Sequence, residues 1–158
     1  SGAPPLLRLI GDGKLEQDLK DQADNLGILD QVDFTGRLDQ KQIANHLRTA
    51  KALCLCSRSE GMPNVVIEAL ASGTPVVATQ VGEVPYLVQP NVNGFLVPND
   101  DSKMTLLAEA LEQALTSEWD HHMISQRMER YTWTEAGRVV IDAIQSRGLL
   151  ESADGGVS

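Results

Sequence analysis

The 158-residue sequence contains only two cysteines, and aromatic residues make up 4% of it. The cysteines, Cys54 and Cys56, are two positions apart, and there is neither a Cys-x-x-Cys pair nor a second cysteine cluster. This pattern excludes a disulfide framework and a cysteine-rich zinc site. Because the two side chains would point the same way from a strand, we expect both to be small, reduced core residues.

Long apolar runs are also missing. No stretch approaches the roughly 20 apolar residues that a transmembrane helix needs. The N-terminus lacks the basic segment and apolar core of an export signal. We therefore expect no transmembrane segment and a cytoplasmic protein.

Positive charge is scarce in this sequence. Lys and Arg together number 13 against 22 Asp and Glu, which gives a formal net charge of -9 and a pI near 4.7. Nucleic acids and anionic membranes attract proteins that have a basic face. The charge balance therefore argues against either as the main partner of this chain.

The remaining composition is that of an ordinary globular domain, with 42% hydrophobic and 22% charged residues. A chain of this length accommodates one domain with a sizeable core but not a second full domain. We expect a linker or cloning remnant at residues 1–5, one domain over residues 6–147, and a polar, disordered tail over residues 148–158.

Segments typical of strands and helices alternate along the chain. Short apolar runs predict strands at residues 6–10, 32–35, 52–56, 75–79 and 95–97. Helical spacing predicts helices at 14–26, 40–49, about 63–72, 103–116 and 121–128, a short helix within 82–88, and a last helix to about 144. This alternation indicates an α/β fold, with a single Rossmann-like, doubly wound parallel sheet covered by helices on both faces.

The stretch Ser59–Ala78 is the most informative part of the sequence and is predicted to form a loop, a short helix and a buried strand. Pro63 suits the first helical position because its missing N–H would have had no partner there. Alternatively, Asn64 is the N-cap. Gly73 is a natural left-handed stop, and Pro75 prevents continuation of the helix.

The start of this helix is a candidate anion site. Its first N–H groups have no intrahelical partner, and the positive end of the helix dipole attracts phosphate. Glu68 would lie roughly 6–8 Å further along the axis, where its carboxylate can accept the hydroxyl protons of a ribose. Glu60, on the preceding loop, would face the other side of a diphosphate. The arrangement indicates a nucleoside diphosphate with a further group attached.

The two glutamates belong to a longer motif, Ser-x-x-Glu-Gly-x-Pro-Asn-Val-x-x-Glu-Ala-x-Ala-x-Gly-x-Pro-Val-Val-Ala-Thr. This motif resembles the donor-site signature of the retaining group 1 glycosyltransferases (glycosyltransferase family 4, GT-B fold), and the resemblance extends from about Leu6 to Ile144. It implies the C-terminal, donor-binding half of a GT-B fold. It also implies that Glu60 is the catalytic-site residue that contacts the donor sugar and that Glu68 holds the ribose. The backbone amides around the helix start would bind the donor at Gly61, Met62, Pro63 and Asn64.

The turn Gly11-Asp12-Gly13 follows the first predicted strand. It is not a full dinucleotide fingerprint, because position 16 is Glu rather than the third glycine. A simple strand-to-helix turn is one reading of this motif. In the resembling family the same turn lines the donor cleft, which would make Gly11 and Gly13 donor-binding residues.

A second turn follows the second predicted strand at Gly36-Arg37-Leu38. The resemblance places Arg37 and Leu38 where family members receive the nucleotide base, and an ordinary loop is the alternative. The residues Gly82-Glu83-Val84-Pro85-Tyr86 depart from the family's Gly-Gly-x-x-Glu pattern at Glu83 and Tyr86.

The resemblance further implies a nucleoside diphosphate sugar as substrate, no cofactor and no metal, and the sequence contains no Asp-x-Asp pair. Family members carry an N-terminal acceptor-binding domain, and an Arg and a Lys before the segment that begins at Leu6. These parts are not in this sequence, so we expect the chain to be inactive alone. Through the absent domain, the protein could lie at the inner membrane face.

Three alternatives remain open. Paired carboxylates also occur in glycoside hydrolases, at separations of about 5–5.5 Å or 6.5–9.5 Å. Glu60 and Glu68 would be about 12 Å apart if all eight intervening steps were helical, so donor binding is favoured over hydrolysis. The others are a non-catalytic nucleotide-sugar-binding or regulatory module, and a GT-B epimerase or hydrolase that acts on the same donor.

Overall fold

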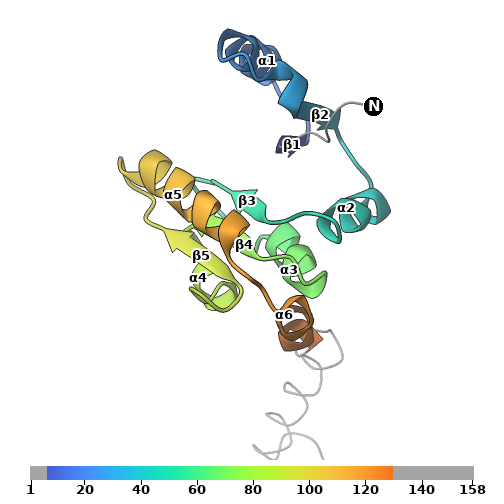
Figure 1. Ribbon diagram of the computed structural model, residues 1–158, viewed down its shortest axis with the longest axis vertical. Coiled ribbons are helices and arrows are strands. Elements are labelled where there is room, and N and C mark those ends of the chain that lie inside the picture. Colours follow the sequence, from blue (N-terminus) through green and yellow to red (C-terminus); the bar gives the residue numbers. More distant parts are fainter. Residues whose placement is uncertain (1–6, 130–158) are drawn as a thin grey trace, which may run out of the picture. The chain divides into compact units, whose positions relative to one another are not determined.

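The computed structural model describes residues 7–129. The expectations for residues 1–5, for the last helix to about residue 144 and for the tail at 148–158 lie outside the described residues. The chain divides into two compact units, Ser1–His46 and Leu47–Ser158, which we call the N-terminal and C-terminal units (Figure 1). Each unit is described by itself. Among the described residues, no helix is both long and apolar enough to cross a bilayer.

The N-terminal unit contains two parallel strands with a helix between them. Its elements are β1 (Leu7–Ile10), α1 (Glu16–Asn25), the 3-10 helix η1 (Leu29–Gln31), β2 (Val32–Gly36) and the start of α2 (Gln40–Leu47). Leu7 is paired with Val32 and Leu9 with Phe34, after which the register shifts so that Ile10 is paired with Gly36. The predicted strand-helix-strand order is therefore confirmed, and η1 is an addition that the sequence pattern did not predict.

Helix α1 ends where Gly27 allows a left-handed turn. Gly27 has φ +67°, its amide donates to Asp24 O at 2.8 Å, and the amide of Ile28 donates to Ala23 O at 2.9 Å. This pair of bonds is the Schellman arrangement, which satisfies the last carbonyl groups of a helix. The helix predicted over residues 14–26 therefore ends within one residue of its predicted end.

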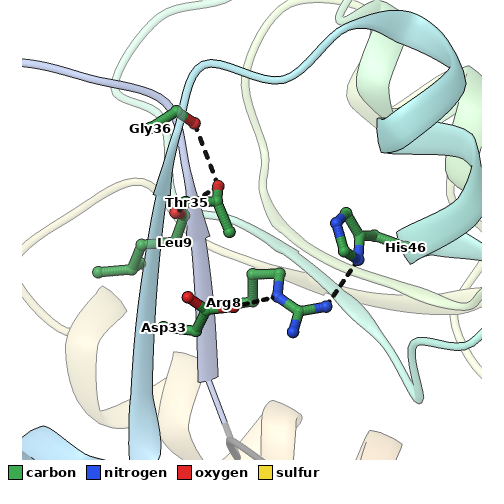
Figure 2. Close-up of polar contacts among 6 residues, drawn as sticks. All are labelled: Arg8, Leu9, Asp33, Thr35, Gly36 and His46. Carbon is green, nitrogen blue, oxygen red and sulfur yellow. Dashed lines mark hydrogen bonds and ion pairs between the residues drawn. The ribbon is translucent and has the colours of Figure 1, made fainter.

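A polar cluster ties the two strands of this unit to α2. Arg8 Nε donates to Asp33 Oδ2 across the strands at 2.7 Å, and the other arm of the guanidinium contacts His46 Nδ1 at 2.6 Å (Figure 2). An arginine can only donate, so Nδ1 of His46 accepts this hydrogen bond. Next to this cluster, the Thr35 hydroxyl contacts the carbonyl oxygen of Leu9 at 3.2 Å.

The C-terminal unit contains three parallel strands in the order β3-β4-β5. Its elements are β3 (Leu53–Leu55), α3 (Asn64–Ala71), β4 (Val76–Thr79), α4 (Val84–Leu87), β5 (Gly94–Val97), α5 (Lys103–Thr116) and α6 (His121–Met128). Every residue of β4 is buried, as expected for a central strand with a neighbour on each side.

The core of the C-terminal unit lies between the sheet and α5, which runs across β4 and β5 (Figure 1). Val77, Phe95 and Val97 of the strands pack against α5, which contributes Leu107, Ala110 and Ala114. Trp119 packs edge-on against Phe95 with ring centroids 5.6 Å apart, and its indole Nε1 donates to Ala114 O at 2.8 Å. Helix α3 packs against α6 and also contacts β3 and β4.

The predicted α/β class with parallel strands is confirmed. The described strands form a two-stranded sheet in the N-terminal unit and a three-stranded sheet in the C-terminal unit. The expectation that both cysteines are buried is wrong, because Cys54 and Cys56 are exposed. The apolar run around β3 predicted burial on both faces, but burial alternates along this strand, and Leu53 and Leu55 provide its packed side. Desolvation by the surrounding protein atoms, followed by the neighbouring Cys56, raises the pKa of the Cys54 thiol to about 11.

Candidate functional site

Glu60 lies on the loop between β3 and α3, where its carboxylate is held by a nearby hydroxyl. Ser57 Oγ donates to Glu60 Oε1 at 2.5 Å, and both side chains are half-buried. A hydrogen bond to a charged oxygen is stronger than one between neutral groups. Ser57 is therefore the hydrogen-bond partner of the glutamate that the resemblance implies to be the catalytic-site residue.

The loop is also held by residues that follow the neighbouring strands. Thr79, the last residue of β4, is fully buried, and its hydroxyl donates to the carbonyl oxygen of Ser57 at 2.6 Å. Asn99, which follows β5, donates from Nδ2 to the carbonyl oxygen of Arg58 at 3.0 Å. Since the carboxyl ends of parallel strands meet at one edge of a sheet, two further strands help to hold the loop that follows β3.

The loop after β4 packs directly against the backbone at Glu60 and Gly61. Gly82 has φ +51°, and a Cβ at this position would overlap Glu60 O and lie 2.5 Å from Gly61 O. The next amide, that of Glu83, donates to Gly61 O at 3.0 Å. Glu83, which departs from the family pattern, thus has a backbone role in bracing this loop, whereas Tyr86 is 74% exposed.

Helix α3 begins one residue after the first sequence alternative and one residue before the start that an N-cap at Asn64 implies. Asn64 is its first residue, and Pro63 stands at the cap position with φ -76° and ψ 105°. The prediction of Asn64 as the N-cap is therefore wrong, and so is that of Pro63 as the first helical residue. Pro63 is buried, whereas Gly61, Met62 and Asn64 are exposed. The exposed residues place the start of α3 at the surface of the unit.

Glu68 lies on α3 four residues after Asn64, which is about 6 Å along the axis at about 1.5 Å per residue. Its side chain is half-buried, so it does not lie on a fully exposed helix face. The far end of α3 is fixed by a second Schellman arrangement, in which Gly73 has φ +78° and the amide of Thr74 donates to Ala69 O at 2.8 Å. The predicted stop at Gly73 is confirmed.

The remaining predicted donor-binding residues, Gly11, Gly13, Arg37 and Leu38, lie in the N-terminal unit. The amide of Gly11 donates to Gly36 O at 2.8 Å, and Arg37 Nε donates to Asp12 Oδ1 at 2.6 Å. The hydrogen bond to Asp12 raises the pKa of Arg37 above its already high usual value. The turns that follow β1 and β2 are thus adjacent within this unit.

Sequence reasoning found Glu60, Glu68 and the helix start but missed the residues that brace them. Thr79 is the last residue of the strand predicted at 75–79, and Asn99 follows the strand predicted at 95–97. A polar side chain that ends a fully apolar strand, as Thr79 does, is a signal that could have indicated such a role. Among the described residues, no group of three or more His, Cys, Asp or Glu side chains is placed to hold a metal ion.

Comparison with known proteins identifies the family of this chain. The sequence profile of the family described as "Glycosyl transferases group 1" matches residues 2–131. The alpha-monoglucosyldiacylglycerol synthase of Streptococcus pneumoniae is 32% identical over 147 residues, which cover 90% of this chain and 33% of that enzyme. The chain spans between 18% and 33% of the length of three curated relatives that it matches.

Solved structures show the same fold. The apo form of the lipopolysaccharide outer core galactosyltransferase WaaB superposes with a TM-score of 0.75 at 22% identity, over 89% of this chain and 40% of that one. Anabaena HepE in complex with UDP and glucose superposes with a TM-score of 0.62 at 25% identity, over 88% of this chain and 40% of that one. These structural neighbours are GT-B glycosyltransferases. Together with the profile match over most of its length, they show that the chain belongs to the group 1 glycosyl transferases.

Proposed function

We propose that this chain is the donor-binding part of a retaining glycosyltransferase, which transfers a sugar from a nucleoside diphosphate sugar to an acceptor. The observation that carries the proposal is the anchored carboxylate of Glu60 next to the exposed start of α3. Family membership supports glycosyl transfer as the reaction. The bound UDP and glucose named for HepE, at 25% identity, support this class of donor.

In this proposal the start of α3 binds the diphosphate. The first amides of a helix have no intrahelical acceptor and carry part of the positive end of the helix dipole. Gly61 is exposed and has open space where a Cβ would be, so a phosphate can approach the backbone there. The same amides would stabilise the negative charge that develops on the departing diphosphate. The chemistry then needs neither a metal nor a cofactor.

The two glutamates have different roles in this arrangement. Glu68, about one turn into α3, accepts hydrogen bonds from the ribose hydroxyls, whereas Glu60 accepts one from the donor sugar. For the N-terminal unit, the family resemblance supports Gly11, Gly13, Arg37 and Leu38 as further donor-binding residues. Because the chain spans a third of the length of the pneumococcal relative, acceptor binding and turnover depend on other parts of the protein.

Calorimetric and NMR titrations of the 158-residue chain test the proposal. Uridine, guanosine and adenosine diphosphates and their sugars are compared as ligands. We expect the nucleotides of one base to bind. Glu68→Gln should weaken binding of the nucleoside diphosphate and binding of the nucleotide sugar by about tenfold each, since a hydrogen bond to a charged group contributes about 1.5–3 kcal/mol. Glu60→Gln should weaken binding of the nucleotide sugar and leave binding of the nucleoside diphosphate unchanged.

The matched control is Glu112→Gln on α5, which removes an exposed carboxylate far along the chain from the motif. It should bind all ligands as the unmodified chain does. The proposal is wrong if no nucleotide sugar binds, or if Glu60→Gln and Glu68→Gln both behave like this control.

A further inference from the structure

We propose that Thr79 and Ser57 form a hydroxyl relay that positions the carboxylate of Glu60 for the donor sugar. The inference rests on the proposed function of Glu60 and adds two positioning residues to it. Neither hydroxyl needs to touch the ligand. The relay runs from the fully buried end of β4, through the backbone of Ser57, to one oxygen of Glu60.

The first step of the relay is a buried hydroxyl with a defined target. Thr79 is 0% exposed at the end of a strand whose other residues are Val76, Val77 and Ala78. Burying a hydroxyl costs free energy unless it is hydrogen-bonded, and a valine would have filled the same space. A hydroxyl has one proton. The 2.6 Å contact with Ser57 O receives it, and Leu55 O lies further away at 3.5 Å.

The second step fixes one oxygen of the carboxylate and leaves the other available. Ser57 Oγ donates its single proton to Glu60 Oε1 at 2.5 Å. Within residues 7–129, the structure shows no side-chain hydrogen bond to Glu60 Oε2. One carboxylate oxygen therefore orients the side chain, while the other can accept a hydroxyl proton from a ligand.

The backbone beneath this carboxylate is braced independently. Gly82 lies against the carbonyl oxygens of Glu60 and Gly61, and Glu83 donates its amide to Gly61 O at 3.0 Å. Asn99 holds the carbonyl of Arg58. With the main chain fixed on both sides, the rotation of the Glu60 side chain is the remaining freedom, and the Ser57 hydroxyl restricts it.

The test separates positioning from a general structural role. Ser57→Ala removes the hydroxyl of Ser57, whereas Ser57→Thr keeps a hydroxyl at this position. Thr79→Val keeps the volume of the buried side chain without its hydroxyl, and Thr79→Ser retains the hydroxyl in case Thr79→Val does not fold. Ser59→Ala is the matched control, since Ser59 is exposed on the same loop and makes no side-chain hydrogen bond within the described residues. Circular dichroism establishes that each variant is folded.

We expect Ser57→Ala and Thr79→Val to weaken binding of the nucleotide sugar by about five- to tenfold, as for the loss of a charge-assisted hydrogen bond. Binding of the nucleoside diphosphate should change by less than about twofold. Ser57→Thr should bind the nucleotide sugar about as tightly as the unmodified chain does, and Ser59→Ala should change neither affinity. Equal losses of affinity for both ligands, or no loss of affinity for the nucleotide sugar, would overturn the relay. If the unmodified chain bound no nucleotide sugar, the proposed function itself would fail.

A second readout does not depend on any ligand. The side-chain carboxyl carbon of Glu60 gives a ¹³C NMR signal that is sensitive to hydrogen bonding at its oxygens. This signal should shift in Ser57→Ala and in Thr79→Val and return toward its original position in Ser57→Thr. An unchanged signal in Ser57→Ala would refute the relay while leaving the proposed donor site intact.

Discussion

Gly82 stands directly against the carbonyl oxygen of Glu60, so closely that any β-carbon at position 82 would overlap it. The two residues are 22 positions apart and belong to loops that follow different strands. Gly82 also has φ +51°, a conformation that other residues adopt only at a cost. The space and the backbone angle thus both require glycine at this position.

Replacing Gly82 should therefore disturb both stability and the proposed donor site. We expect Gly82→Ala to lower the free energy of unfolding by about 2 kcal/mol or more, because backbone strain and overlap add. It should also weaken nucleotide-sugar binding by moving Glu60. Urea unfolding and titration measure the two effects. Gly61→Ala, with open space at the Cβ position and no positive φ, is the control for stability. Equal unfolding midpoints for the two variants would contradict this account.

The loop between α4 and β5 depends on a single buried amide. Asn93 is 3% exposed, accepts the amide of Gln89 at 2.6 Å and donates to Leu87 O at 3.0 Å. Asn93→Ala leaves both partners without their bond, so we expect a loss of about 2–3 kcal/mol in the free energy of unfolding. Chemical denaturation measures it. Gln126→Ala, at an exposed position of α6, should change stability by less than about 0.5 kcal/mol.

Cys54 should react slowly at neutral pH in spite of its exposure. Its pKa is raised to about 11, first by desolvation and then by Cys56, and only the thiolate is nucleophilic. In the variant Cys56→Ser, we expect the rate of alkylation by iodoacetamide to keep rising above pH 9, where an ordinary thiol levels off. Glutathione under the same conditions is the control. A rate that levels off near pH 9 would show that the thiol is not desolvated.

The raised pKa of Cys54 also makes the stability of the folded chain depend on pH. Because the folded-state pKa lies above that of the unfolded chain, the folded protein holds this proton more tightly. The contribution of Cys54 is therefore fully present below about pH 9 and is lost as the pH rises toward about 11. Denaturation midpoints should fall over this range in the unmodified chain and fall less in Cys54→Ala.

The sequence predicted those features that depend on neighbours along the chain. Gly27 and Gly73 end their helices as expected, because a left-handed cap is a local requirement. The bounds of α5 are those predicted, since its spacing is long and regular. The parallel strands followed from the alternation of apolar runs with amphipathic segments. The predicted α/β class needed no knowledge of distant contacts.

Features that depend on distant neighbours were not predictable in this way. The bond from Thr79 to Ser57 joins residues 22 positions apart, and no periodicity encodes it. The exposure of Cys54 depends on which side of β3 is packed, which the apolar run alone does not specify. Glu60 and Glu68 were predicted because they belong to the motif, whereas Gly82 and Asn99, which brace the loop at Glu60, lie outside it.

The edge-on packing of Trp119 against Phe95 makes the C-terminal unit optically distinguishable. Both tryptophans of the sequence, Trp119 and Trp133, follow residue 46, so indole emission originates entirely outside the N-terminal unit. Far-ultraviolet dichroism, by contrast, records helices from both units. Melting the chain while following both signals will therefore reveal whether the two units lose their structure in one step or in two.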